Sequence, residues 1–308
     1  MIHVYIRGGR LGNQLFQYAY IRHLQKHNPE QKVCYHFDEV YQAGSPEDDF
    51  VNALKFFKVK DVEESGTNPK LSLIQKILLR IYWRFFPHRD NEYERNIFQK
   101  RWVRLMDVFN LKYLDVGYHK FRDKVEGDVI VSGCFESEKY FADIKNEILE
   151  EIKPLRGISE KNQLMLERMR NTNSVLLSVR RGDFVYDTKF SSMHAVCTPK
   201  YYERAWEYMK AHVENPVLFI FSNDIEWVKQ NLDFGVETHY ESGNDPSWEA
   251  LELMSNCKHF IISNSTFNWW AQYKSTNNEK IVCAPARWWN SPLKPDLFLD
   301  NWTLISVD

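Results

Sequence analysis

Four short polar segments of this 308-residue sequence carry the side chains best suited to chemistry, and each follows an apolar run. They are RGGRLGNQ at 7–14, RRGD at 180–183, SND at 222–224 and SNST at 263–266. Arg180 and Arg181 offer planar cationic forks that match phosphate oxygens. Asp183 can orient one of these arginines or cap the turn that follows. These residue types predict a site for a phosphate-bearing small molecule, and the alternative is a structural Arg–Asp network.

The segments at 222–224 and 263–266 each leave two interpretations open. Backbone N–H groups at a helix start, together with the helix dipole, favour an anion beside Ser265 and Thr266. Simple N-capping by either hydroxyl is the alternative. Asp224 can accept hydrogen bonds from a nucleobase or ribose, or it can be the N-cap of the helix that begins at residue 225.

The opening turn combines three glycines with one cationic and two amide side chains: Gly8, Gly9, Arg10, Gly12, Asn13 and Gln14. Glycines let a backbone approach a ligand closely or adopt positive φ. The spacing is neither Gly-x-Gly-x-x-Gly nor a Walker motif, so ordinary dinucleotide and P-loop sites are excluded. A turn near a charged small molecule is predicted, and glycines that merely form a turn are the alternative.

Apolar runs predict strands at 2–6, 33–37, 129–133, 174–179, 217–222, 259–263 and 281–285. Most are followed by predicted helices, one beginning with Thr198 and Pro199, and another running from Ser137 toward Ile152. Residues 38–70 are predicted to be irregular. The alternation predicts an α/β fold with parallel sheets, whose ligands bind beyond the carboxyl ends of the strands. The length predicts two domains, 1–155 and 156–308.

Composition and residue spacing bear on the expected partners, cellular location and metal content of the protein. The formal charge of −2 argues against a nucleic-acid partner. Five scattered cysteines without a Cys-x-x-Cys pair predict reduced, mostly buried thiols and a cytoplasmic location. Neither a signal peptide nor a membrane span is expected. No Asp-x-Asp pair occurs and no histidine spacing stands out, so no metal is expected; arginine and a helix N-terminus would neutralise a bound pyrophosphate.

Residues 70–89 predict an amphipathic helix with an unusual charge pattern. One stripe is apolar (Leu71, Ile74, Leu78, Ile81 and Phe85), another is basic (Lys76, Arg80 and Arg84), and no acidic residue interrupts them. Packing of the apolar stripe on its own domain is the ordinary interpretation. The alternative is peripheral contact with the anionic inner face of the cytoplasmic membrane.

The segments GRLGNQLFQYA, SVRRGDFV, FSNDIEWVKQNL and LMSNCKHFIISNSTFNWWAQY, in this order, resemble the bacterial α-1,2-fucosyltransferases of glycosyltransferase family 11. The resemblance extends from Gly9 to about Pro285, with little contribution from 38–125. It implies a GT-B-like fold of two Rossmann-like parallel-sheet domains facing a central cleft. It also implies inverting, metal-independent transfer of L-fucose from GDP-fucose, with the 2-hydroxyl of a terminal β-galactoside in a glycan as the expected acceptor. Residues 1–155 would form the acceptor side, and 156–308 would bind GDP.

The resemblance also implies roles for individual residues. Those implied in catalysis are Arg180, Asn13, Arg10 and Asp183; those implied in donor binding are Gly9, Gly12, Gln14, Ser178, Arg181, Asn223, Asp224, Asn264, Ser265, Thr266 and Phe267. The Gly-Arg-x-Gly-Asn-Gln turn is similar to one in protein O-fucosyltransferases, where it lies at the reacting sugar. The family pattern His-x-Arg-Arg-x-Asp has serine, Ser178, at its first position here, so a histidine base at this point is not expected.

Three other functions fit the sequence. A related glycosyltransferase would use another nucleotide sugar. A non-catalytic sugar-binding protein would stack sugars on tryptophans such as Trp269, Trp270, Trp288 and Trp289, most of which are expected in the core. A scaffold would dock through residues 70–89. Release of GDP from GDP-fucose on addition of β-galactosides separates an enzyme from the last two.

Overall fold

The structure is a computed structural model that describes residues 1–46, 49–87, 92–182, 188–241 and 244–308. It divides into two compact units: unit 1 is Met1–Leu155 with Pro295–Leu297, and unit 2 is Arg156–Lys294 with Phe298–Asp308. The short segment in unit 1 was expected in the second domain. Asp296 anchors it there, because its carboxylate accepts the Tyr118 backbone N–H at 2.9 Å and lies 2.7 Å from Lys139 Nζ.

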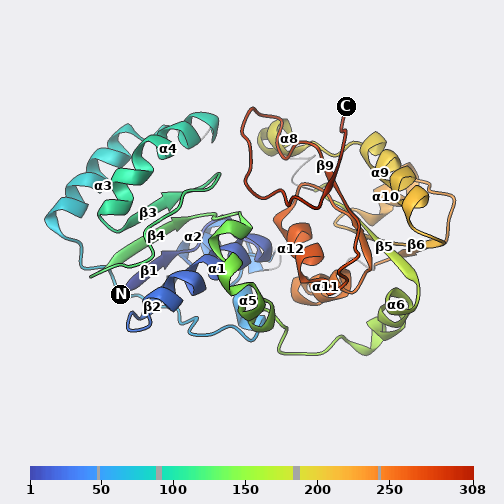
Figure 1. Cartoon of the computed structure of the whole chain (residues 1–308), viewed down its shortest axis with the longest axis horizontal. Coiled ribbons are helices and arrows are strands. Elements are labelled where there is room, and N and C mark those ends of the chain that lie inside the picture. Colours follow the sequence, from blue (N-terminus) through green and yellow to red (C-terminus); the bar gives the residue numbers. More distant parts are fainter. Residues whose placement is uncertain (47–48, 88–91, 183–187, 242–243) are drawn as a thin grey trace. The chain divides into compact units, whose positions relative to one another are not determined.

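Unit 1 contains a four-stranded parallel sheet in the order β2-β1-β4-β3. Its strands are β1 (Ile2–Tyr5), β2 (Val33–His36), β3 (Leu111–Leu114) and β4 (Val129–Gly133). Three of these match the predicted strands to within one residue at either end, and β3 was not predicted. The helices are α1 (Leu11–His27), α2 (Asp38–Ala43), α3 (Leu73–Phe85), α4 (Glu92–Val108) and α5 (Lys145–Glu151). Figure 1 shows α3 and α4 together beside β3, with α1 and α5 on the other side of the sheet.

Two expectations for unit 1 need correction. Residues 38–70 are not wholly irregular, because they contain α2 and the 3₁₀ helix η2 (Ala53–Phe56). Ser137 is an N-cap, as predicted, but of the 3₁₀ helix η3 (Glu138–Tyr140), and η4 (Ala142–Ile144) follows before α5 begins. The backbone of Phe141 leaves the helical region (φ −145°, ψ 17°), so a single helix from Ser137 to Ile152 is not formed.

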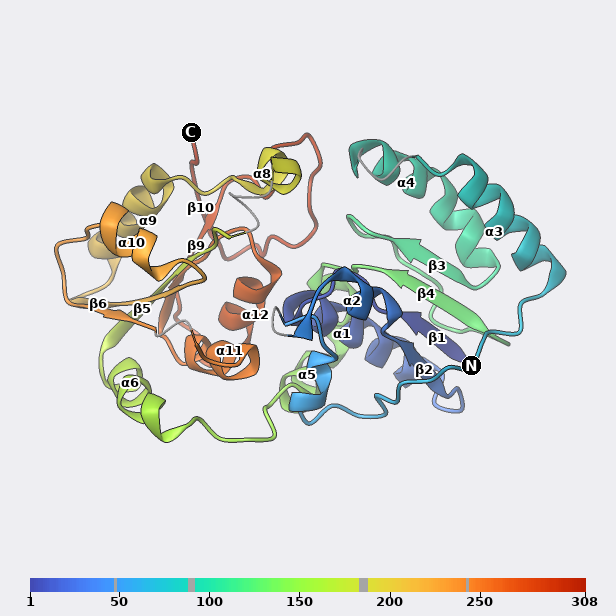
Figure 2. The ribbon, with the colours of Figure 1, turned by 180° about the vertical axis from the view of Figure 1, so that it is seen from behind.

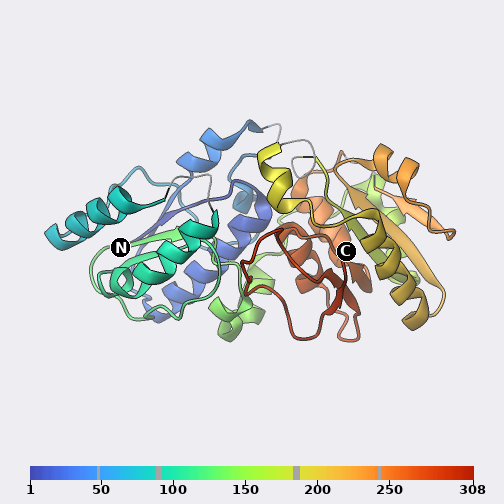
Figure 3. The same ribbon diagram turned by 90° about the horizontal axis from the view of Figure 1, so that it is seen from above.

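The amphipathic helix predicted within 70–89 is α3, which Ser72 and Gln75 begin with a capping box. Its packing differs from the expectation. Tyr82 is buried and meets the Phe98 ring of α4 at 5.1 Å between centroids. Figure 3 shows the ribbons of α3 and α4, in teal, as neighbours. Leu78 is partly buried with it, whereas Ile74, Ile81 and Phe85 of the predicted stripe are exposed. Much of the apolar stripe therefore remains on the surface of unit 1.

Unit 2 contains a six-stranded parallel sheet in the order β10-β9-β8-β5-β6-β7. The strands are β5 (Asn173–Val179), β6 (Pro216–Ser222), β7 (Thr238–Tyr240), β8 (His259–Ile261), β9 (Val282–Pro285) and β10 (Thr303–Ile305). The helices are α6 (Glu160–Asn171), α8 (Thr188–His194), α9 (Pro199–His212), α10 (Ile225–Asn231), α11 (Ser247–Ser255) and α12 (Thr266–Lys274). Figure 2 shows α9 and α10 on one side of this sheet and α11 and α12 on the other.

Several predictions about a helix start, buried side chains and membrane spans are confirmed. Thr198 caps α9 with Pro199 in its first turn. Trp269 and Trp270 are fully buried, and Trp288 and Trp289 nearly so, which makes them core residues rather than sugar platforms. All five cysteines are free, and Cys34, Cys257 and Cys283 are buried. In the described part of the chain, every helix is too short or too polar to cross a bilayer.

Candidate active site

Three of the four polar segments meet at one edge of the unit 2 sheet. The RRGD, SND and SNST segments follow β5, β6 and β8, and these strands are parallel neighbours in the order β8-β5-β6. The carboxyl ends of the three strands therefore lie side by side, which is where an open α/β sheet binds its ligands. Arg180 is half-buried directly after β5, and Asp183 lies outside the described residues.

Arg181 is held within unit 2 by three contacts. Its guanidinium stacks on Trp227, its Nε lies 3.2 Å from Asp224 Oδ2, and its backbone N–H donates to Asn223 Oδ1 at 2.9 Å. Asp224 also accepts the Trp227 N–H and caps α10, which is the structural alternative left open for this residue. Arg181 is therefore part of an Arg–Asp network, and Arg180 precedes it directly at the end of β5.

The SNST segment behaves differently from the SND segment. Ser265 is the N-cap residue of α12, but its side chain makes no capping hydrogen bond, whereas the Asp224 side chain caps α10. Thr266 and Phe267 form the first turn of α12 and are half-exposed. The N-terminus of α12, the positive end of its dipole, therefore lies at this sheet edge, and the Ser265 side chain does not cap it. Such a helix end favours a bound anion.

Two further predicted donor-binding residues are buried under this edge. Ser178 Oγ donates to Asn268 Oδ1 at 2.8 Å, and Asn268 donates in turn to Ser263 Oγ at 2.6 Å, which ties β5 to α12. Asn264 Nδ2 donates to the carbonyls of His194 and Trp288, each at 2.9 Å. These contacts give Ser178 and Asn264 bracing roles inside unit 2.

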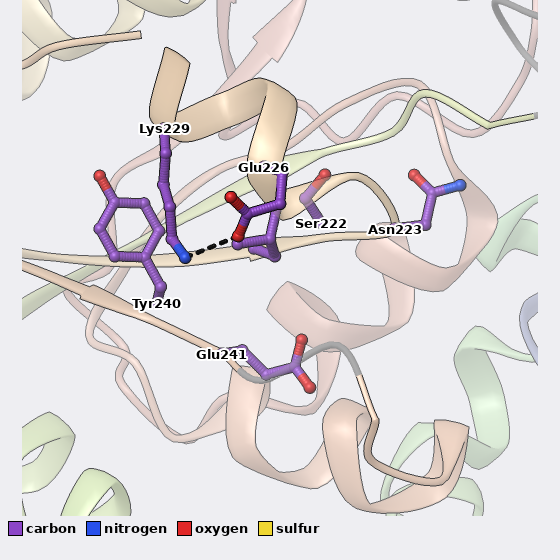
Figure 4. Close-up of a pocket in the computed structure, with 7 residues that line it drawn as sticks. Ser222, Asn223, Glu226, Lys229, Tyr240 and Glu241 are labelled. Atoms are coloured by element: carbon purple, nitrogen blue, oxygen red, sulfur yellow. Dashed lines mark hydrogen bonds and ion pairs between the residues drawn. The ribbon is translucent and has the colours of Figure 1, made fainter. Parts of the chain in front are cut away.

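A pocket of about 360 Å³ opens beyond β6 and β7. Its lining residues are Ser222, Asn223, Ile225, Glu226, Lys229, Tyr240 and Glu241. Figure 4 shows Glu241 across the pocket from Glu226, whose carboxylate lies 2.8 Å from Lys229 Nζ. Glu241 is buried although it carries a carboxylate. Ser222 and Asn223 belong to the predicted SND segment. Tyr240 and Glu241 were missed because the short strand β7 that positions them has no clear apolar pattern.

The glycine-rich turn follows β1 in unit 1 and leads into α1. Gly8 and Gly9 have φ of 77° and 66°, and a Cβ on Gly9 would lie 2.5 Å from the Phe50 ring. Both the close approach and the positive φ therefore require glycine at this position. Arg10 is the N-cap residue of α1, and its guanidinium carbon lies 5.2 Å from the centroid of the same Phe50 ring.

The other residues predicted in this turn are placed on α1. Gly12 is buried in its first turn, and Asn13 Nδ2 lies 3.4 Å from the Gly8 carbonyl. Gln14 is fully buried; its amide donates to the carbonyls of Gly9 and Val51 and accepts the Ala53 N–H. The Gln14 side chain thus braces the turn from below and is not presented to a ligand.

Two features of this turn were missed. Gln17 donates to the Arg7 carbonyl and accepts the Arg7 N–H, which fixes the start of the turn. The Arg7 side chain pairs with Asp115 at 3.1 Å and with Glu39 at 3.3 Å. Burial lowers the pKa of Arg7, but the Asp115 carboxylate, with smaller contributions from Cys134 and Glu39, outweighs burial and raises it. The signal for Asp115 was its place directly after β3, a strand that was not predicted.

The glycosyl transferase family 11 model matches residues 72–306, so the chain belongs to this family. An α-1,2-colitosyltransferase from Escherichia coli is 34% identical over 173 residues, which are 55% of this chain and 59% of that protein. The O-antigen biosynthesis glycosyltransferase WbnK from Escherichia coli is 25% identical over 96% of this chain and 97% of its own. The squirrel-monkey (Saimiri boliviensis boliviensis) galactoside α-(1,2)-fucosyltransferase 1 is 26% identical over 67% of this chain and 58% of its own.

Among solved structures, that of the NodZ α-1,6-fucosyltransferase co-crystallised with GDP matches with a TM-score of 0.55 at 13% identity, over 88% of this chain and 91% of its own. NodZ from Bradyrhizobium matches with a TM-score of 0.53 at 12% identity over the same shares. The likeness confirms the predicted α/β fold of GT-B type with two parallel-sheet units. The chain spans little more than half of the colitosyltransferase and of the monkey enzyme, 59% and 58% of their lengths.

Proposed function

We propose that this protein transfers L-fucose from GDP-fucose to a hydroxyl of a glycan acceptor, with the 2-hydroxyl of a terminal β-galactoside as the expected position. The observation that carries the proposal is the meeting of three polar segments at the carboxyl ends of β8, β5 and β6, inside the region matched by the family model. Relatives named as α-1,2-fucosyl and α-1,2-colitosyl transferases support the linkage.

In this proposal unit 2 binds the nucleotide. The pocket beyond β6 and β7 contains the buried Glu241 carboxylate. The Watson–Crick edge of guanine has adjacent N–H groups, and a carboxylate can accept hydrogen bonds from them. Arg180 and the N-terminus of α12 lie at the neighbouring strand ends, where a diphosphate can follow the base. This arrangement needs no divalent ion, so we expect turnover to survive EDTA.

The transfer itself is a displacement at the anomeric carbon. The acceptor oxygen attacks from the face opposite GDP, the C–O bond to GDP breaks, and the configuration inverts. Negative charge grows on departing GDP, and Arg180 with the α12 N-terminus stabilises it. Arg10 and Asn13, held by the braced turn of unit 1, orient the reacting groups. Asp183 remains a proposed base or orienting group, since the proton of the acceptor hydroxyl must be taken up.

The test compares Arg180→Ala with Arg287→Ala, a matched control at an exposed arginine of the same unit that pairs with Asp308. Arg180→Ala is expected to lower kcat by about 10²–10³-fold while the melting temperature stays close to that of the unchanged protein. Arg287→Ala is expected to keep full turnover. A loss below about tenfold in Arg180→Ala would remove this residue from the charge-stabilising role.

A second donor has a specific observation in its favour, the 34% identity to the colitosyltransferase. Colitose is fucose without its 3-hydroxyl, so a site that accepts one sugar can differ from a site for the other by a single hydrogen-bonding group. A screen of GDP-fucose, GDP-colitose, GDP-mannose and dTDP sugars against a panel of galactosides separates the two. Absence of nucleotide release with every donor would favour a sugar-binding protein without turnover.

We also propose that α3 brings the protein to an anionic lipid surface at the inner face of the cytoplasmic membrane. Ile74, Ile77, Ile81 and Phe85 recur at helical spacing and are exposed, and Lys76, Arg80 and Arg84 flank them. The helix contains no acidic residue, so its charge complements anionic headgroups while its apolar stripe can enter the interface.

Co-sedimentation with vesicles tests this contact. Arg80→Glu with Arg84→Glu is expected to abolish binding to vesicles that contain anionic lipid, and binding of the unchanged protein is expected to weaken with salt. The control is Lys58→Glu with Lys200→Glu, which makes the same charge change at exposed lysines elsewhere. Equal binding by the two double variants would mean that the exposed stripe does not meet lipid.

A further inference from the structure

Two histidines and an aspartate meet on unit 1 at the far end of α1 from the glycine turn. His23 and His27 are one helical turn apart on α1, and Asp143 comes from η4. One ligand atom from each lies within 4.8 Å of the others. His23 Nδ1 is 2.7 Å from Asp143 Oδ1, and His27 Nε2 is 3.8 Å from Asp143 Oδ2. The spacing His23-x-x-x-His27, which presents both rings on one face of α1, was missed in the sequence.

A second carboxylate lies behind the first histidine. His23 Nε2 is 3.2 Å from Asp123 Oδ1, on the opposite side of the ring from Asp143. Both ring nitrogens of His23 lie within hydrogen-bonding distance of a carboxylate, so an ion bound at Nδ1 would take the place of the proton shared with Asp143 while Nε2–H donates to Asp123. Metal-binding histidines commonly donate their other ring N–H to a carboxylate in this way.

We propose that His23, His27 and Asp143 bind a divalent transition-metal ion and that Asp123 positions His23. Two imidazoles and one carboxylate suit Zn²⁺, Co²⁺ or Ni²⁺ better than Mg²⁺ or Ca²⁺, which prefer oxygen ligands alone. In a tetrahedral site with bonds of about 2.0 Å the ligand atoms stand about 3.3 Å apart. The present separations bracket this value, and all three side chains are partly exposed, so small side-chain rotations complete the site.

The position of the site determines what the ion does. Leu11 and His23 are separated by about 18 Å along α1 at 1.5 Å per residue, so the ion is remote from the glycine turn. Binding joins the last turns of α1 to the segment that leads into α5. The ion is therefore a structural clip of unit 1, and its binding is independent of the proposed transfer reaction.

The experiment titrates Co²⁺ and Ni²⁺ into the full chain at pH 7.5 by calorimetry, after removal of any histidine tag and of residual metal. One equivalent is expected to bind, and the melting temperature is expected to rise with metal concentration. His23→Gln and His27→Gln are each expected to weaken binding by at least tenfold, and Asp123→Asn by about tenfold. His212→Gln, an exposed histidine on α9, is the matched control and is expected to change nothing.

Two results would overturn the site. One is unchanged affinity and stoichiometry in the double variant His23→Gln/His27→Gln, and the other is absence of binding to the unchanged protein up to about 1 mM metal, a range weaker than built sites show. The Co²⁺ absorption spectrum of the unchanged protein supplies a check that needs no variant. Nitrogen and oxygen ligands give weak d–d bands only, whereas an intense thiolate band would place the metal on a cysteine instead.

Discussion

The Arg181 guanidinium lies 3.6 Å from the centroid of the Trp227 ring and stacks on it. The same group pairs with Asp224, the residue that caps α10, so the first turn of α10 holds Arg181 from two sides. Arg181 therefore joins the end of β5 to the start of α10 and contributes to the packing of unit 2.

This stacking predicts an energetic coupling between Arg181 and Trp227. Arg181→Ala and Trp227→Leu are each expected to lower the melting temperature, and the double variant is expected to lose less than the sum. A double-mutant cycle in urea should give a coupling energy of about 0.5–2 kcal/mol, as for a partly desolvated cation–π pair. Additivity within about 0.3 kcal/mol would show that the ring and the guanidinium do not stabilise each other.

The buried carboxylate of Glu151 predicts acid sensitivity of unit 1. Burial pushes the pKa of Glu151 upward, but hydrogen bonds from Arg22 at 2.8 Å and Tyr18 at 2.5 Å outweigh burial and bring the pKa below its usual 4.5. Because the folded-state pKa is the lower one, the stabilisation is present above pH 4.5 and is lost as the pH falls through the folded-state value.

The measurement is the melting temperature between pH 3 and pH 7. Glu151→Gln is expected to cost about 3 kcal/mol at neutral pH, because it leaves Arg22 without its buried partner, and to flatten the fall below pH 4.5. Glu150→Gln changes the neighbouring, exposed glutamate and should leave the profile unchanged. Parallel profiles for the Glu151 variant and the unchanged protein would refute this role.

The close approach of Gly9 to Phe50 predicts that no larger residue is tolerated at position 9, in the turn before α1. Gly9→Ala adds a Cβ that would lie 2.5 Å from the Phe50 ring, in addition to the cost of positive φ. The Phe50 ring must shift, and Arg10 contacts that ring, so turnover is expected to fall by at least tenfold. Gly127→Ala has a similar φ of 71° but open space around the Cβ, so it reports the backbone cost alone, about 1 kcal/mol. Equal effects of both variants on turnover would rule out crowding at Phe50 as the cause.

On the proposed function, the Glu241 carboxylate is expected to recognise the guanine base of the donor. Glu241→Gln replaces one acceptor by a donor and is expected to raise KM for the GDP donor about 10–100-fold, the worth of hydrogen bonds to a charged group, with little change in kcat. Glu207→Gln is the control, because Glu207 is an exposed glutamate of the same unit that pairs with Lys210 and lies outside the pocket. A fall in kcat at constant KM would place Glu241 away from the base.

Much of the sheet architecture was predictable because its central strands are long apolar runs. "SVLLSV" and "VLFIFS" each lie in a seven-residue strand at the centre of unit 2. The strands that escaped prediction are three or four residues long, and β7 and β10 are edge strands of partly exposed residues, so neither shows an apolar period. Strand β3 is fully buried but includes Lys112, whose charge is paired with Asp107 at 2.7 Å. Such pairing is a tertiary feature that local sequence does not show.

The candidate site was predictable at the level of segments and less so at the level of side chains. Positions after strands identified the polar edge of unit 2, since parallel strands align their carboxyl ends. Whether a polar residue faces a ligand or braces the fold depends on distant partners. Gln14 bonds residues near position 52, and Ser178 bonds Asn268 on α12, which no spacing within the motifs could reveal.

The return of Pro295–Leu297 to unit 1 has a practical consequence for engineering. Ser137 Oγ donates to the Asp296 carbonyl at 2.8 Å, in addition to the two contacts of the Asp296 carboxylate. Neither unit is therefore encoded by one uninterrupted stretch of sequence. A chimera that exchanges residues 1–155 with those of a relative would place Asp296 against a foreign surface, so the exchange keeps these contacts only when residues 295–297 are exchanged as well.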